Sequence, residues 1–134
     1  MQFLIETDVL REYLIAKQGE QALLRKALSR GVCYTTMYNA LELFRASRTK
    51  EENDAIMQVL MSVRVLGFNS RFAQNFADMA KEVEKKGIIL SQREAMIVGM
   101  AKASKLTILT TDFFDRYKAI GTVPVARSTE EVPK

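Results

Sequence analysis

The sequence of 134 residues contains no histidine and no tryptophan, a single cysteine and two prolines. Without histidine the chain has no imidazole to act as a general base, to complete a Ser-His-Asp triad or to bind zinc. The lone Cys33 cannot form a disulfide within the chain, which is typical of a reducing compartment, and we expect it to be a small buried apolar residue. Any catalysis must therefore use carboxylates, hydroxyls and cations.

The chain also lacks long apolar runs. No stretch approaches the roughly 20 apolar residues that span a bilayer, and no basic segment precedes an apolar one at the N-terminus, so we expect a cytoplasmic protein. The length suits one domain, and 48% hydrophobic and 27% charged residues are ordinary for a globular chain. The net charge of +4 favours an anionic partner only weakly, because small domains often carry such a charge for solubility.

Short apolar runs alternate with helical patterns along the chain. Strands are predicted at 3–5, 32–34, 65–66, 106–109 and 123–125, the last at a sheet edge because of Pro124. Helices are predicted at 7–17, 20–30, 70–86 and 91–104, with a short helical turn at 112–117. Thr7 or Asp8 is the predicted cap of the first helix. Two more helices are predicted to begin after Thr35 or Thr36 and after Thr49, the latter in a capping box with Glu52. This order predicts a three-layer α/β/α sandwich with a mainly parallel central sheet over residues 1–126, followed by a flexible tail at 127–134.

Two of the predicted helices carry apolar faces of their own. Met37, Leu41 and Phe44 recur at the i, i+4, i+7 spacing of a core-facing helix. In the next helix Met57 and Met61 lie beside the apolar face, and such methionines more often fill a core than form a binding surface.

Four acidic residues follow or flank the predicted strands: Glu6, Glu42, Glu94 and Asp112. Glu6 ends the first strand and Asp112 follows the fourth, so both face one sheet edge if these strands are neighbours. Glu42 lies among apolar residues of a helix, where an unpaired carboxylate is costly. Converging carboxylates repel one another, and a hard divalent cation such as Mg²⁺ or Mn²⁺ would relieve that repulsion. Such a site can activate water for in-line phosphoryl displacement.

Each acid also has a purely structural role open to it. Glu94 fits the N3 position of a capping box, and Asp112 can form a turn. Asp8 can cap a helix, and Glu42 can pair with Arg45 at i+3. The prediction of a shared site therefore depends on the order of the acids relative to the strands.

That order resembles a PIN domain, in particular the VapC-type toxin ribonucleases of VapBC toxin–antitoxin pairs. The resemblance covers about residues 2–125. It rests on four motifs, which are Ile5-Glu6-Thr7-Asp8-Val9-Leu10, Glu42-Leu43-Phe44, Leu90-Ser91-Gln92-Arg93-Glu94-Ala95-Met96-Ile97 and Leu109-Thr110-Thr111-Asp112.

The resemblance implies a Mg²⁺- or Mn²⁺-dependent endoribonuclease that hydrolyses RNA phosphodiester bonds. The catalytic and metal-binding residues would be Glu6, Glu42, Glu94 and Asp112, with Thr7, Asp8 and Thr110 in supporting positions. Flanking cations that could contact RNA phosphates are Arg93, Arg116 and Lys118. The family also implies a cognate antitoxin, bound in an apolar groove that includes part of 36–62, and a homodimer.

The chain departs from the family at two of the four acids. The family usually has Asp where this chain has Glu6 and Glu94, whose longer side chains can change the position or affinity of the metal. After the fourth acid the order Phe113-Phe114-Asp115 also differs, so Asp115 is not expected to assist. Two alternatives stay open: a catalytically weakened PIN-like RNA- or protein-binding module, and a phosphohydrolase of small phosphate esters.

Overall fold

The computed structural model describes residues 1–17, 21–111 and 116–126. Its strands are β1 (Gln2–Ile5), β2 (Val32–Thr36), β3 (Arg64–Leu66), β4 (Thr107–Leu109) and β5 (Val125–Ala126). Its helices are α1 (Thr7–Ile15), α2 (Leu23–Leu28), α3 (Met37–Ala46), α4 (Lys50–Met61), α5 (Ser70–Glu84), α6 (Gln92–Ser104) and α7 (Arg116–Ile120). The predicted tail at 127–134 lies outside the described residues.

The strands form one sheet in the order β3-β2-β1-β4-β5, and every pair among them is parallel. The first and fourth strands are neighbours, with Phe3 opposite Thr107 and Ile5 opposite Leu109, which meets the condition for residues at their ends to face one sheet edge. Strand β5 lies at an edge, directly after Pro124, as predicted. The carboxyl ends of β1 and β4 therefore lie side by side.

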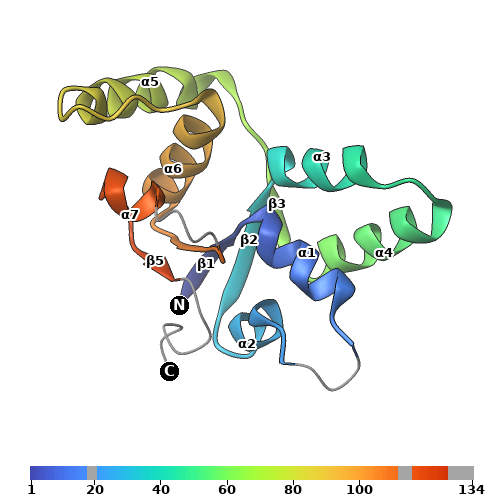
Figure 1. Cartoon of the computed structure of the whole chain (residues 1–134). Helices are drawn as coiled ribbons and strands as arrows, with labels where there is room; N and C mark the ends of the chain where they lie inside the picture. Colours follow the sequence, from blue (N-terminus) through green and yellow to red (C-terminus); the bar gives the residue numbers. More distant parts are fainter. Residues whose placement is uncertain (18–20, 112–115, 127–134) are drawn as a thin grey trace.

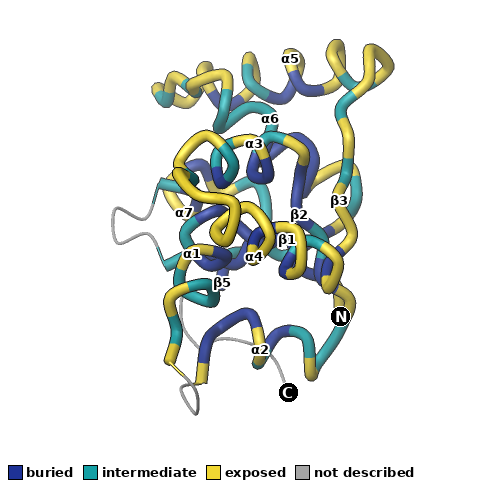
Figure 2. The backbone as a smooth tube through the Cα atoms, turned by 90° about the vertical axis from the view of Figure 1, so that its right-hand side faces the viewer, coloured by how far each residue is buried: buried dark blue, intermediate teal, exposed yellow. Residues whose placement is uncertain are grey.

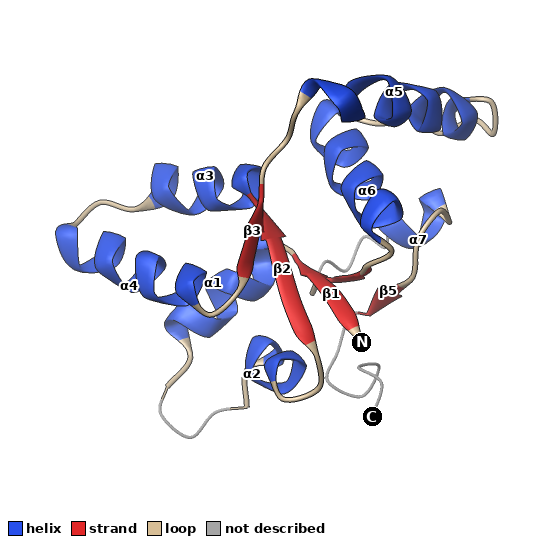
Figure 3. Cartoon of the chain, turned by 180° about the vertical axis from the view of Figure 1, so that it is seen from behind, coloured by secondary structure: helices blue, strands red, loops and turns tan. Residues whose placement is uncertain are grey.

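Helices cover both faces of the sheet, so the predicted α/β/α sandwich is confirmed. Figures 1 and 3 show α1 to α4 on one side and α5 to α7 on the other. Phe3 and Ile5 pack in the core cluster beneath α1 to α4, whereas Leu4 packs in the cluster beneath α5 to α7. All three side chains are fully buried, because neighbouring residues of a strand face opposite sides of the sheet.

Several helix boundaries follow from capping side chains. Thr36 accepts a hydrogen bond from the backbone of Asn39, and Ser91 forms a capping box with Glu94. Thr49 accepts from the backbone of Glu52, but the Glu52 carboxylate accepts from the backbone N–H of Arg48, outside the predicted box. The first two helices are shorter than predicted, since α1 ends at Ile15 and α2 spans only Leu23–Leu28.

The predicted apolar face of α3 is wrong at Met37 and Leu41, while Phe44 is partly buried against the core. Met37 is 58% exposed and Leu41 is 54% exposed, whereas Asn39, Ala40 and Leu43 are buried. On α4 the same holds for Met57 and Met61, which are exposed and do not fill the core. In Figure 2, α4 lies on the face turned to the viewer and is drawn largely in the yellow of exposed residues.

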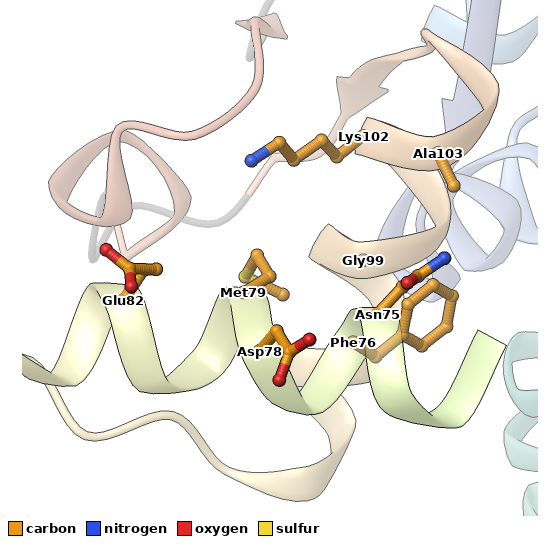
Figure 4. A pocket seen from close by; sticks show the side chains of 8 residues that line it. All are labelled: Asn75, Phe76, Asp78, Met79, Glu82, Gly99, Lys102 and Ala103. Atoms are coloured by element: carbon orange, nitrogen blue, oxygen red, sulfur yellow. The ribbon is translucent and has the colours of Figure 1, made fainter.

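Helices α5 and α6 approach each other closely at Gly99. A Cβ atom placed on Gly99 would lie 2.6 Å from the ring of Phe76. Phe76 stacks on Phe72 with ring centroids 5.5 Å apart. A hollow of about 440 Å³ lies beside this contact. Figure 4 shows its lining, with Gly99 and Lys102 on α6 and Asp78 on α5. In the part of the chain that the structure describes, no helix is long and apolar enough to cross a membrane.

Candidate functional site

A cleft of about 730 Å³ opens where β1 and β4 end. It lies at the sheet edge at which parallel α/β proteins bind their ligands. The cleft is lined by Glu6, Thr7, Asp8, Arg11, Glu42, Ser91, Arg93, Glu94, Thr110, Thr111, Arg116 and Tyr117. The structure thus brings three of the four predicted acids to one cleft, and the fourth, Asp112, lies outside the described residues together with Asp115.

Glu6 is the most buried acid of the cleft, with 4% of its surface exposed. Its backbone N–H donates to the Leu109 carbonyl, and it occupies the N-cap position of α1, so the predicted cap at Thr7 or Asp8 is wrong. Its carboxylate accepts hydrogen bonds from Asn39 Nδ2 at 2.7 Å and from the Tyr117 hydroxyl. A buried carboxylate needs such partners, and a cation as well, to offset its lost hydration.

That cation is Arg93, which lies between Glu6 and Glu42. Arg93 Nη1 and Nη2 donate to the two oxygens of Glu6, each at 2.9 Å. Arg93 Nε and Nη2 donate to the two oxygens of Glu42 at 3.0 and 2.9 Å. One guanidinium therefore makes a two-point contact with each of two carboxylates, which is the strongest form of this ion pair.

These contacts shift the pKa values of the groups that make them. Burial alone would disfavour the charged forms, but hydrogen bonds with Glu42 and Glu6 hold the pKa of Arg93 above its usual value. Hydrogen bonds from Arg93 and Thr7 outweigh burial at Glu42 and lower the pKa of its carboxyl. Burial, followed by the charge of Glu6, raises the pKa of the Tyr117 phenol. The cluster thus keeps the Glu42 carboxyl ionised, with Tyr117 as a neutral donor.

Asn39 connects Glu6 to Glu42 through the hydroxyl of Thr7, and it was not predicted as a site residue. Its side-chain amide donates to Glu6 and, at 2.9 Å, to the Thr7 hydroxyl, which in turn donates to Glu42 at 2.5 Å. The amide oxygen accepts from the Thr36 hydroxyl. Asn39 lies one helical turn before Glu42 on the same face of α3, and that spacing was the available signal in the sequence.

Asp8 connects the first turn of α1 to the end of β4. Its Oδ2 accepts from the Thr110 hydroxyl at 2.7 Å and from the Thr111 backbone N–H at 3.0 Å. Its Oδ1 is buried and receives no hydrogen bond from any residue within 1–17, 21–111 or 116–126. Buried carboxylate oxygens usually have partners, so this oxygen is a candidate for an additional ligand in the cleft.

Glu94 takes the structural role that its position in a capping box predicts. Its Oε1 accepts from the Ser91 backbone N–H at 2.9 Å, and its Oε2 pairs with Arg116 Nε at 2.5 Å. Although burial alone would raise the pKa of Glu94, the bonds from Arg116 and Ser91 lower it. Lys118 is exposed on α7 and is not among the lining residues of the cleft.

The donors of the cleft suit a hard divalent cation in kind, since they are carboxylate oxygens from three elements. One of these oxygens, Asp8 Oδ1, has no hydrogen-bond partner among the described residues. The arrangement nevertheless pairs these oxygens with arginines: Glu6 and Glu42 with Arg93, and Glu94 with Arg116. Within the described part of the chain no group of three or more acidic, histidine or cysteine side chains is placed to hold a metal ion. The chemistry of the donors thus fits Mg²⁺ or Mn²⁺, while a protein cation lies between two of them.

No family model matches the sequence, and no curated protein matches it at the sequence level. Solved structures do match. A chain of VapBC2 from Rickettsia felis, solved bound to a DNA fragment from the promoter, is 18% identical, with a TM-score of 0.76 over 94% of this chain and 98% of that one. VapBC-1 from nontypeable Haemophilus influenzae is 16% identical, with a TM-score of 0.73 over 94% and 97%. FitAcB from Neisseria gonorrhoeae is 20% identical, with a TM-score of 0.68 over 93% and 96%. This chain therefore has the PIN-like α/β/α fold found in VapBC and FitAB toxin–antitoxin complexes, the fold that its motifs imply.

Proposed function

We propose that this chain is the toxin of a VapBC-type pair and hydrolyses RNA phosphodiester bonds with Mg²⁺ or Mn²⁺. The observation that carries the proposal is the meeting of Glu6, Glu42 and Glu94, from three separate elements, in one cleft of a fold shared with toxin–antitoxin complexes. A surface that served only for solubility would have no reason to bury Glu6 at the end of the central strand.

In this proposal Glu6 and Glu42 hold the divalent ion, with Glu94 and Asp112 as further ligands and Asp8 Oδ1 near enough to the cleft to order water. A divalent ion bound there supplies an activated water and stabilises negative charge on the phosphoryl oxygens. Thr7 orients the Glu42 carboxylate, and Asn39 orients Glu6 and Thr7 together. Lys118 and Arg116 lie on α7, from which they can contact phosphates of the RNA backbone.

The partners proposed for the chain follow from the same likeness. The neighbours are solved as VapBC and FitAB complexes, so we propose a cognate antitoxin for this chain as well. Met37, Leu41, Met57 and Met61 are all exposed on α3 and α4 and offer an apolar surface to a partner segment. The homodimer that the resemblance implies also stays a proposal.

The first experiment is RNA cleavage by the purified chain with Mn²⁺, with EDTA, and as Glu42→Gln and Asp112→Asn variants. We expect the parent to cleave RNA with Mn²⁺ and not with EDTA. The cleavage rate of either variant should fall by about 100-fold or more, because each substitution removes a proposed metal ligand. Glu51→Gln is the matched control: Glu51 is an exposed acid on α4 that is not among the lining residues of the cleft, and its variant should cleave like the parent.

A PIN-like RNA- or protein-binding module is the second candidate, and the pairing of Arg93 with both Glu6 and Glu42 favours it. A module of this kind has no need of the ion, so its carboxylates can be neutralised permanently. If tRNA, ribosomal RNA and single-stranded RNA all survived Mn²⁺, and calorimetry detected no Mn²⁺ binding, the binding module would replace the nuclease.

A further inference from the structure

The Arg93 guanidinium uses all of its hydrogen-bond donors inside the cleft. Its five N–H groups make two bonds to Glu6, two bonds to Glu42 and one bond to the Tyr117 hydroxyl at 2.9 Å. No N–H group is left for an RNA phosphate in this arrangement. The prediction that Arg93 contacts RNA therefore requires Arg93 first to leave both acids.

The position of Arg93 is also the position that a shared metal ion would need. Glu6 and Glu42 turn both of their oxygens toward the guanidinium, so a cation that bridged them would have to lie in its place. Arg93 and a divalent ion would repel each other there, since both are positive and the Glu6 carboxylate between them is buried. The two cations are therefore alternatives for the same carboxylates.

The exchange of one cation for the other needs little movement of the backbone. Arg93 is the second residue of α6, its side chain is 29% exposed, and Tyr38 flanks the guanidinium at 5.9 Å. Its long side chain can rotate outward into the solvent while α6 stays in place. Glu6 would remain buried without a cation, which is costly, so Arg93 is held until another cation takes over.

We propose that Arg93 competes with the divalent ion for the carboxylates of Glu6 and Glu42. It pairs with both carboxylates in the metal-free protein and rotates out into the solvent when metal binds. This inference rests on the proposed metal-dependent function and adds its regulation. Competition by Arg93 weakens metal binding to the free chain. If Arg93 has left the carboxylates in one molecule in ten, the site binds metal about tenfold more weakly than a site that Arg93 never occupies.

The test is Mn²⁺ affinity, measured by calorimetry on the full chain and its variants. We expect Arg93→Gln to bind Mn²⁺ about tenfold or more tightly than the parent. Arg93→Lys should fall between the two, because an ammonium keeps the charge but cannot make two-point contacts with both acids. Arg71→Gln, which removes an exposed arginine on α5, should bind like the parent.

Arg11→Gln separates direct competition from a general effect of charge. It removes a positive charge that lines the same cleft and acts on Glu42 through its charge alone. If Arg11→Gln and Arg93→Gln tightened Mn²⁺ binding equally, the gain would be electrostatic and the proposal would be refuted. Circular dichroism and thermal unfolding check that each variant is folded.

A second measurement uses the parent protein alone. The Arg93 Nε–H should give a slowly exchanging NMR signal in the metal-free chain, and titration with diamagnetic Mg²⁺ should remove its protection. A signal that stayed protected at saturating Mg²⁺ would overturn the inference and leave the nuclease proposal standing. Absence of Mn²⁺ and Mg²⁺ binding in the parent and in every variant would contradict both.

Discussion

Cys33 lies on β2 in the middle of the sheet, with only 3% of its surface exposed. Burial raises the pKa of its thiol to about 12, and a thiol of that pKa holds about one thiolate in ten thousand molecules at pH 8. We predict that dithiobis(nitrobenzoate) leaves the native protein unmodified over an hour and reacts with one thiol per chain in urea. Rapid reaction without denaturant would show that β2 opens locally.

Whether a residue of the cleft could be predicted from the sequence depends on how far along the chain its partners lie. Glu6, Glu42 and Glu94 were predictable because each has a fixed place relative to a strand or a helix start. The pairing of Arg93 was not, since its partners lie 51 and 87 positions away and local pattern carries no sign of them. The i+3 pairing of Glu42 with Arg45 was the local alternative, and in the structure Glu42 takes Arg93 as its cation.

At the scale of elements, the contact between α5 and α6 depends on Gly99. An added Cβ would meet the Phe76 ring at 2.6 Å, and Phe76 is itself held between Phe68 and Phe72. We predict that Gly99→Ala lowers the free energy of unfolding by about 1–3 kcal/mol, as overpacking in a core does. Chemical denaturation would measure the change.

Gly67→Ala is the matched control for that substitution. Gly67 follows β3, an added Cβ there meets no atom within 4 Å, and its φ angle is not in the left-handed region. We expect its unfolding free energy to stay within about 0.5 kcal/mol of the parent, or to rise slightly. Equal losses in the two variants would mean that Phe76 moves aside and that the close helix contact is not what stabilises this layer.

Apolar spacing predicted that α3 exists, but it misplaced the buried face of α3. Asn39 and Glu42 turn toward the cleft, and this turns Met37 and Leu41 outward. When polar residues of a site lie on the inner face of a helix, the spacing of the apolar residues no longer predicts which residues are buried. Capping residues predicted the starts of α3 and α6, because Thr36 and Ser91 act within a single turn, although the cap predicted for α1 is wrong.

For the molecule as a whole, the order of the sheet predicts an order of stability. The Glu6 N–H donates to Leu109 between the two central strands, whereas the Thr110 N–H donates to Ala126 on the two-residue edge strand. We expect native-state hydrogen exchange to show Glu6 opening only with global unfolding and Thr110 opening at lower free energy. Equal protection at the two amides would mean that β5 is an integral part of the core.

The layers and the parallel sheet could be predicted from the sequence, since buried strands and amphipathic helices alternate in regular order. The pairing of β1 with β4 was only a condition of the predicted shared site, because the sequence does not give the order of the strands in the sheet. The outward position of α4, which leaves Met57 and Met61 exposed, could not be predicted, because an exposed apolar helix face and a buried one have the same spacing.

The bond between Tyr117 and Glu6 joins residues that are 111 positions apart. While a ribosome makes this chain, Glu6 and Asn39 emerge early, but Arg93, β4 and Tyr117 are still unmade or inside the exit tunnel. The nascent chain can pair β1 with β2 and bury one face of β1, yet it cannot complete the cleft until Tyr117 has left the exit tunnel. Folding that waits for such distant contacts is slow, so each newly made molecule passes through an interval without a formed cleft before it can act.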